Sequence, residues 1–186
     1  MTARRQLSTH VQATAPLLQA LAAAHRAVDQ DAAIEAVFKA VDAALLGAIG
    51  YKLFTILLYD DAVTESIRVY SNRAGDYPLG GRKKIVSRRW ADQVVRDGVP
   101  FIGNTAADLR EVFSDHALIS SLGCESVLNM PVRWGGKTVG SLNLLHDAYW
   151  YQGVDLSAVA VFAQLVAPAL MTVPVPKDPA GLDIGA

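Results

Sequence analysis

The chain has 186 residues, of which 52% are hydrophobic and 19% are charged. This length suits one domain with a sizeable core, and the composition excludes a chain that is disordered over most of its length. The formal net charge of −1 at pH 7 shows no basic excess, so nucleic acid is not an expected partner.

The first part of the chain predicts helices followed by strands. Residues 1–30 are a lead-in whose apolar positions show helical spacing from 17 to 28. A second amphipathic stripe runs from Ile34 to Ala48, where glycines mark the end of a helix. The continuous apolar run Leu53–Tyr59 predicts a strand buried on both faces, and the alternating run Ser66–Ser71 predicts a strand nearer an edge.

The middle of the chain, residues 73–123, predicts loops and short helices. Its first residues are rich in glycine. The basic run Arg82–Lys84, with Arg88 and Arg89, is interpreted as a solvated loop and helix start. Ser87, Thr105 and Ser114 are each suited to capping the start of a short helix, and a short strand at 100–102 lies between the first two. We expect this segment to form a lid.

The clearest β signal surrounds Gly135 and Gly136. Two strand-like runs flank this pair, which predicts a hairpin with a two-residue turn. Counting back from the turn pairs Leu128 with Asn143. That register sends Asn129 and Asn143 to opposite faces of the sheet.

The last predicted helix runs from Val154 to Met171, with Pro168 late in it. Residues 172–186 are rich in Pro, Gly and Asp, and we expect a disordered tail. The order of elements predicts an α+β fold, with an antiparallel sheet that carries helices on one face and the lid on the other. Such a cover leaves a pocket between the sheet and the lid.

Four segments in a fixed order carry a resemblance to a known family. They are the strand Leu53–Tyr59, the stretches Pro100–Asn104 and Gly123–Val132, and the glycine turn with its Gly-x-Leu strand, Gly135–Leu144. With them the chain resembles a GAF domain, which we place at residues 31–171. The resemblance implies a GAF-like, PAS-related sheet of five to six strands with terminal helices packed on one face. It also implies a homodimer through those helices, since the helix at 17–28 has nothing else in a single domain to pack on.

The resemblance implies a sensory module that binds a small molecule and signals through a dimer or a separate partner. The sequence contains no nucleophile elbow, no His-Glu-x-x-His motif, no phosphate-binding loop, no dinucleotide fingerprint and no Cys-x-x-Cys metal spacing. We therefore expect neither an enzyme nor a metal site. The candidate ligand-binding residues are Phe101, Asn104, Asp108, Phe113, His116, Asn129 and Asn143. The sequence names neither the ligand nor a cofactor.

Cys124 carries the main alternative, a thiol-based redox enzyme or sensor. Some stand-alone GAF proteins of similar size reduce free methionine-R-sulfoxide, which requires an attacking thiolate and a resolving cysteine. Cys124 is the only cysteine, so an internal disulfide is excluded. The competing interpretation is a buried small hydrophobic residue.

Two further ligand classes of GAF domains fit the sequence only in part. His116 and His146 lie near the histidines of bilin-binding domains, but each is one residue out of register and no cysteine precedes His116. Asn104 and Phe113 resemble residues of cyclic-nucleotide domains, whose Lys and Asp-Glu pair are missing here. The sequence therefore favours neither class.

A structural domain without a ligand is the remaining alternative. It would act only as a dimerisation unit, and a pocket filled by Trp90, Phe101 and Phe113 would favour it. The sequence leaves this alternative open.

We expect a cytoplasmic protein without a membrane partner. The longest apolar stretches, roughly ten residues, are too short to span a bilayer. The N-terminus shows no apolar core followed by a small-residue cleavage site, and the lone cysteine is typical of a reducing compartment.

Overall fold

The structure is a computed structural model, and it describes residues 18–173 except 20, 24, 27–33 and 61. Most of the predicted lead-in 1–30 and nearly all of the predicted tail 172–186 lie outside the described residues. The described residues between 18 and 26 are helical, as their spacing predicts. Leu21 packs against the main core of the same chain. The premise that this segment has no partner within one domain is therefore wrong, and the homodimer remains a prediction.

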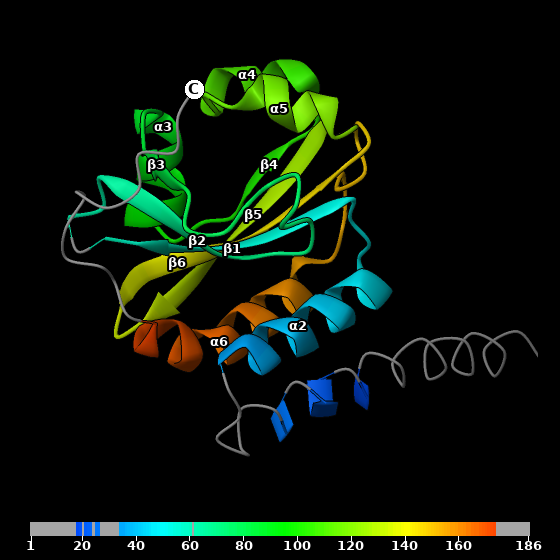
Figure 1. Cartoon of the computed structure of the whole chain (residues 1–186), viewed down its shortest axis with the longest axis vertical. Helices are drawn as coiled ribbons and strands as arrows, with labels where there is room; N and C mark the ends of the chain where they lie inside the picture. Colours follow the sequence, from blue (N-terminus) through cyan, green and yellow to red (C-terminus); the bar gives the residue numbers. More distant parts are fainter. Residues whose placement is uncertain (1–17, 20, 24, 27–33, 61, 174–186) are drawn as a thin grey trace, which may run out of the picture.

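Six strands form one antiparallel sheet, in the spatial order β3-β2-β1-β6-β5-β4 (Figure 1). The strands are β1 (Leu53–Tyr59), β2 (Glu65–Ser71), β3 (Arg82–Lys84), β4 (Phe101–Gly103), β5 (Ser126–Trp134) and β6 (Lys137–His146). Strand β1 lies between β2 and β6 and is buried along almost its whole length. The prediction of a five- to six-stranded antiparallel sheet is confirmed.

Helices α2 (Ile34–Ala48) and α6 (Leu156–Thr172) lie side by side on one face of the sheet (Figure 1). Their buried stripes, which include Leu45 and Phe162, pack on Phe54 and its neighbours to form the main core. Pro168 does not end α6, which continues to Thr172. The predicted packing of these two helices on one face is confirmed.

Gly140 marks the tightest approach between α6 and the sheet. A Cβ at this position would lie 2.1 Å from the backbone oxygen of Leu57 and 2.5 Å from a methyl group of Leu170. Only a residue without a side chain fits here, because β6 and α6 approach each other over this point.

The opposite face is covered by what we call the lid, which consists of the loop 72–81 and four short helices. These are α3 (Arg88–Trp90), the π-helix η1 (Ala91–Arg96), α4 (Ala106–Val112) and α5 (His116–Ser121). Ser87 and Thr105 cap α3 and α4 as predicted. Asp115, and not Ser114, is the residue that precedes α5. The first part of the basic run, Arg82–Lys84, which we assigned to a loop, forms β3 and pairs with β2, while Arg88 and Arg89 begin α3 as predicted.

The hairpin differs from the predicted register by one residue. Its turn is the predicted one, because Trp134 pairs with Lys137 across the two glycines. A β-bulge follows, so that Val132 pairs with Gly140 while Arg133 pairs with Thr138. Beyond the bulge Asn129 lies directly opposite Asn143, and the prediction that they face opposite sides of the sheet is wrong. A single extra residue on β6 reverses every side chain beyond it.

Candidate functional site

A cavity of about 70 Å³ lies between the lid and the sheet. Strands β1, β2, β5 and β6 form its floor, and β3 with the lid forms its walls. Polar and charged residues that line it are Thr55, Ser66, Arg68, Lys83, Lys84, Ser87, Ser114, Asn129 and Asn143. The aromatic side chains that line it are Tyr77, Trp90 and Phe113, and its other side chains are largely aliphatic. The cavity therefore combines a polar floor with apolar walls, which is the usual composition of a small-molecule site.

A chain of buried hydrogen bonds crosses the floor of the cavity. The indole Nε1 of Trp90 donates to Oδ1 of Asn129 at 2.9 Å, and Nδ2 of Asn129 donates to Oδ1 of Asn143 at 2.6 Å. Oγ of Ser141 donates to the same oxygen of Asn143 at 3.0 Å, and the hydroxyl of Tyr59 donates to Ser141 at 2.9 Å. The register shift makes this network possible, because it places both asparagines on the lid face.

Arg68 lies on β2 and is only 8% exposed, although it carries a charge. Its Nη1 donates to the backbone oxygen of Pro78 at 2.7 Å, and its guanidinium lies 3.4 Å from the centre of the Tyr77 ring. Its Nε is buried and has no hydrogen-bond partner among the described residues. The absence of a side chain at Gly81 makes room for the guanidinium, because a Cβ there would lie 3.1 Å from Nη1.

Lys83 and Asp115 form an ion pair that joins β3 to the start of α5. The hydroxyl of Tyr77 donates to the same carboxylate. Burial lowers the pKa of the Lys83 ammonium, and the charge of Asp115 offsets part of that effect. Burial by itself would raise the pKa of the Asp115 carboxyl, but the charge of Lys83 and the hydrogen bonds from Lys83 and Tyr77 outweigh it and hold that pKa below its ordinary value.

The structure brings three of the seven candidate ligand-binding residues to this cavity, namely Phe113, Asn129 and Asn143. His116 begins α5 and is not among the lining residues. Phe101 is half-buried between two smaller apolar clusters and pairs with Asn129 through the backbone only.

Asp108 forms the capping box of α4 with Thr105, Asn104 precedes that box, and neither Asn104 nor Asp108 lines the cavity. The carboxylate of Asp108 accepts from the backbone N–H groups of Asn104 at 2.8 Å and Thr105 at 2.9 Å. The hydroxyl of Thr105 accepts from the backbone N–H of Asp108 in return. The carboxylate of Asp108 is thus committed to the helix terminus.

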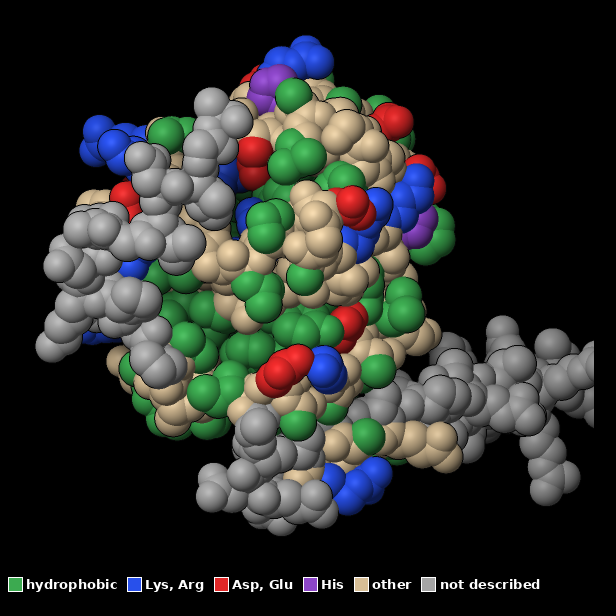
Figure 2. All heavy atoms as spheres, in the orientation of Figure 1, with side chains coloured by type: hydrophobic (Ala, Val, Ile, Leu, Met, Phe, Trp, Pro, Cys, Tyr) green, Lys and Arg blue, Asp and Glu red, His purple; other side chains and the backbone are tan. Residues whose placement is uncertain are grey.

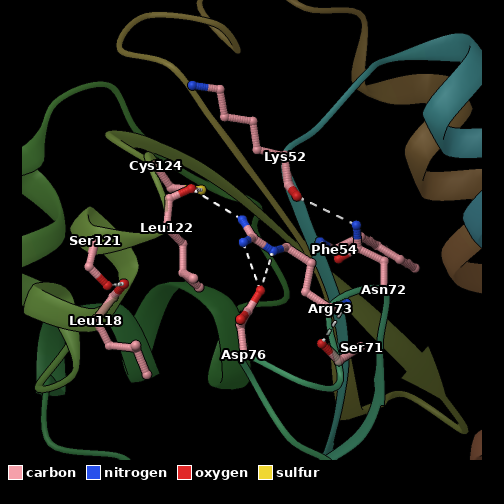
Figure 3. Close-up of polar contacts among 10 residues, drawn as sticks. All are labelled: Lys52, Phe54, Ser71, Asn72, Arg73, Asp76, Leu118, Ser121, Leu122 and Cys124. Atoms are coloured by element: carbon pink, nitrogen blue, oxygen red, sulfur yellow. Dashed lines mark hydrogen bonds and ion pairs between the residues drawn. The ribbon is translucent and has the colours of Figure 1, made fainter.

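Cys124 lies in the loop between α5 and β5, and it is fully buried. Figure 3 shows its sulfur beside the carbonyl of Leu122, which accepts a hydrogen bond from Arg73. Burial raises the pKa of the Cys124 thiol to about 11, although the charges of Lys52 and Arg73 oppose that effect. The thiol is therefore held in its unreactive protonated form at neutral pH.

Arg68 and Lys83 line the cavity but were not among the seven candidate residues, and Trp90 was named only as a side chain that could fill the pocket. The alternation of β2 contained the signal for Arg68, because Ser66 and Arg68 share one face of the strand. We interpreted the alternation only as a sign of a strand nearer an edge, and the structure places the lid over this polar face.

The described part of the chain contains no group of three or more His, Cys, Asp or Glu side chains arranged to hold a metal ion. No helix within that part is long and apolar enough to cross a membrane. On the face drawn in Figure 2, Lys and Arg side chains are interspersed with Asp and Glu and do not gather into one patch.

An antiparallel sheet with two long helices behind it and a lidded cavity in front defines an α+β domain of the GAF type. The chain belongs to the GAF domain family, whose model matches residues 7–170. No curated protein matches the sequence.

Solved structures share this fold. The GAF domain of a phosphoenolpyruvate-protein phosphotransferase from Coxiella burnetii is 16% identical, with a TM-score of 0.63 over 83% of this chain and 92% of that one. The phycoerythrobilin-bound GAF domain of a cyanobacterial phytochrome is 16% identical, with a TM-score of 0.64 over 83% and 93%. A methyl-accepting chemotaxis protein fragment is 17% identical, with a TM-score of 0.61 over 80% and 94%. At these identities the comparison establishes the fold.

Proposed function

We propose that this protein is a sensory GAF module that binds a small molecule in the cavity between sheet and lid. The observation that carries this proposal is the cavity itself, in which buried hydrogen-bonding groups face a space enclosed by apolar walls. Buried polar groups of this kind hold a ligand in one orientation, while the apolar walls supply most of the binding free energy.

The coupling of binding to a signal would begin at the lid. The lid is held to the sheet by the bond between Trp90 and Asn129 and by the ion pair between Lys83 and Asp115. A ligand that contacts these groups changes the relative stability of two lid positions. Strand β5 carries Asn129 on the lid side and packs against α6 on its other side, so a shift in the floor reaches the terminal helices.

The signal would leave the domain through a homodimer or a separate partner. Leu46 of α2 and both Val161 and Met171 of α6 are exposed hydrophobic side chains on the two helices behind the sheet. Such side chains support contact with a second copy. The same surface supports the alternative of a domain that only dimerises, but the cavity left between Trp90 and Phe113 favours a module with a ligand.

Our proposal places the protein in the cytoplasm. It includes no catalytic step and no nucleic-acid or membrane partner. The buried, protonated thiol of Cys124 argues against redox chemistry, because the nucleophile in that chemistry is a thiolate. The mixed surface charge and the net charge of −1 argue against a nucleic-acid surface.

Native mass spectrometry of the full chain purified from its own host tests the proposal. We expect a reproducible extra mass that is released on denaturation, and an absorbance spectrum of the same sample identifies a bilin or haem. Unfolding and refolding the protein should remove the extra mass. Adding the released fraction back to the refolded protein should restore that mass. A chain that carries no extra mass and is not stabilised by any compound of a metabolite library would contradict the proposal and favour the dimerisation unit.

A further inference from the structure

We propose that the ligand is a small carboxylate and that Arg68 binds its carboxylate group. This inference rests on the proposed function and names the class of molecule that the cavity takes. It is carried by a buried guanidinium that lines the cavity with part of its hydrogen-bonding capacity unused.

Arg68 has no anionic partner among the described residues. It contacts the backbone oxygen of Pro78 and the side chain of Tyr77, and neither carries a negative charge. Removing a charge from water is unfavourable unless an opposite charge and hydrogen bonds compensate. An anion in the cavity supplies both to Arg68.

The unused edge of the guanidinium has the geometry that a carboxylate requires. Nη1 is committed to Pro78, whereas Nε is buried without a hydrogen-bond partner among the described residues. Nε and Nη2 present two N–H groups in one plane. A carboxylate accepts from such a pair with its two oxygens.

The charges around the cavity favour a single negative charge over a phosphate group. The ammonium of Lys83 is already paired with Asp115, and Lys84 is exposed to solvent at the rim. Arg68 is therefore the buried cation that lacks a carboxylate in this part of the structure. A phosphate monoester carries nearly two negative charges at neutral pH and needs a second free cation.

The remaining lining describes the body of the ligand. Leu57, Ile85 and Ile119 provide apolar contacts, while Thr55 and Asn143 offer hydrogen bonds at the floor. The bonds from Asn143 to Thr55 are long, at 3.3 and 3.4 Å, so a ligand group competes with them at little loss. The cavity of about 70 Å³ is smaller than the roughly 150 Å³ that holds a benzene molecule. The ligand is thus a short carboxylate, unless the lid moves outward.

The test compares carboxylates with their uncharged amides on the full chain. We would titrate ¹⁵N-labelled protein with acetate, pyruvate and butyrate, and separately with acetamide, pyruvamide and butyramide, at constant ionic strength. Two-dimensional NMR follows the backbone signals of the cavity and the Nε–H signal of Arg68. At least one carboxylate should shift these signals to saturation, and its amide should bind at least tenfold more weakly.

Two variants complete the test. Arg68→Gln should weaken binding of the carboxylate at least tenfold, whereas Arg96→Gln, which removes an exposed arginine paired with Asp92, should bind as the unmodified protein does. Arg68→Lys keeps the charge without the paired donors, and it should bind more weakly than the unmodified chain. The comparison of acids with amides uses the unmodified chain, so it remains decisive if Arg68→Gln does not fold.

The outcomes separate this inference from the proposed function. Amides that bind as tightly as the acids, or tight binding by folded Arg68→Gln, would overturn the carboxylate assignment while leaving a cavity that binds ligands. If no probe shifts the cavity signals, the carboxylate assignment is also overturned. Native mass spectrometry of the protein from its host would then decide the proposed function by itself.

Discussion

The indole Nε1 of Trp90 donates a 2.9 Å hydrogen bond to Oδ1 of Asn129, and this bond joins the first helix of the lid to the floor of the cavity. Both side chains are buried, so neither group has water as a substitute partner. Asn129 in turn donates to Asn143 on the neighbouring strand. The position of the lid is thereby connected to hydrogen bonds in the middle of the sheet.

We predict that Trp90→Phe lowers the free energy of unfolding by about 1–3 kcal/mol, since it leaves a buried oxygen of Asn129 without its donor. Urea denaturation measures this change. Trp134→Phe is the matched control, because Trp134 is 46% exposed at the end of the hairpin and should change stability by less than about 0.5 kcal/mol. Equal effects of the two substitutions would refute the structural role of the Trp90 bond.

Gly140→Ala should be destabilising by about 1–3 kcal/mol, because its methyl group has no space between the backbone of Leu57 and the side chain of Leu170. Gly47→Ala is the informative counterpart. Gly47 lies in α2 with nothing within 4 Å of an added Cβ, so alanine should stabilise the protein by about 0.5–1 kcal/mol. Thermal unfolding of both variants provides the measurement, and a stable Gly140→Ala protein would show that α6 does not pack on β6 as described.

Acid should weaken the attachment of α5 through Asp115. The folded state holds the pKa of this carboxyl below its ordinary value of 3.8, so the unfolded chain takes up the proton first as the pH falls. The stabilisation is present above that value and is lost as the pH falls through the lower, folded-state pKa.

Asp115→Asn should therefore reduce the dependence of unfolding free energy on pH between 5 and 3, relative to the unmodified chain. Asp108 also has a lowered pKa, so some dependence should remain. Asp92→Asn, in an exposed ion pair, serves as the control and should follow the unmodified protein. Urea denaturation at a series of pH values distinguishes these cases, and a curve for Asp115→Asn parallel to that of the unmodified chain would contradict the role of the ion pair.

The thiol of Cys124 should react slowly with a disulfide reagent such as Ellman's reagent in the native protein at pH 7.5. It is fully buried, and burial raises its pKa to about 11, so both access and thiolate formation are suppressed. The rate should rise by orders of magnitude in urea that unfolds the chain. Rapid and complete reaction of the native protein would revive the redox alternative.

Local signals in the sequence predicted much of the fold. The hydroxyl groups of Ser87 and Thr105 cap helices where the pattern places them, because a cap depends on residues only three positions apart. The apolar run Leu53–Tyr59 forms a buried strand, and the two glycines after Trp134 form the hairpin turn. The order of these elements was sufficient to predict an α+β domain with a lid.

The candidate site was predicted less completely, and the asparagines show why. Asn129 and Asn143 were chosen as candidate ligand-binding residues, but they were assigned to opposite faces. The β-bulge beside Val132 reverses that assignment, and although the neighbouring Pro131 can mark a bulge, the residue alone does not determine that one forms. A bulge forms where it improves the packing of the whole sheet, so local patterns do not predict it.

The sequence by itself determined most of the helices and strands, the hairpin turn and the caps at Ser87 and Thr105, because each of these depends on neighbours along the chain. The tertiary structure alone decided that Asn129 faces Asn143 and that Arg68 points beneath a lid. These relationships join segments that are distant in sequence. Their free energies come from burial and from pairing across space, and such contacts are defined only once the sheet and the lid have come together.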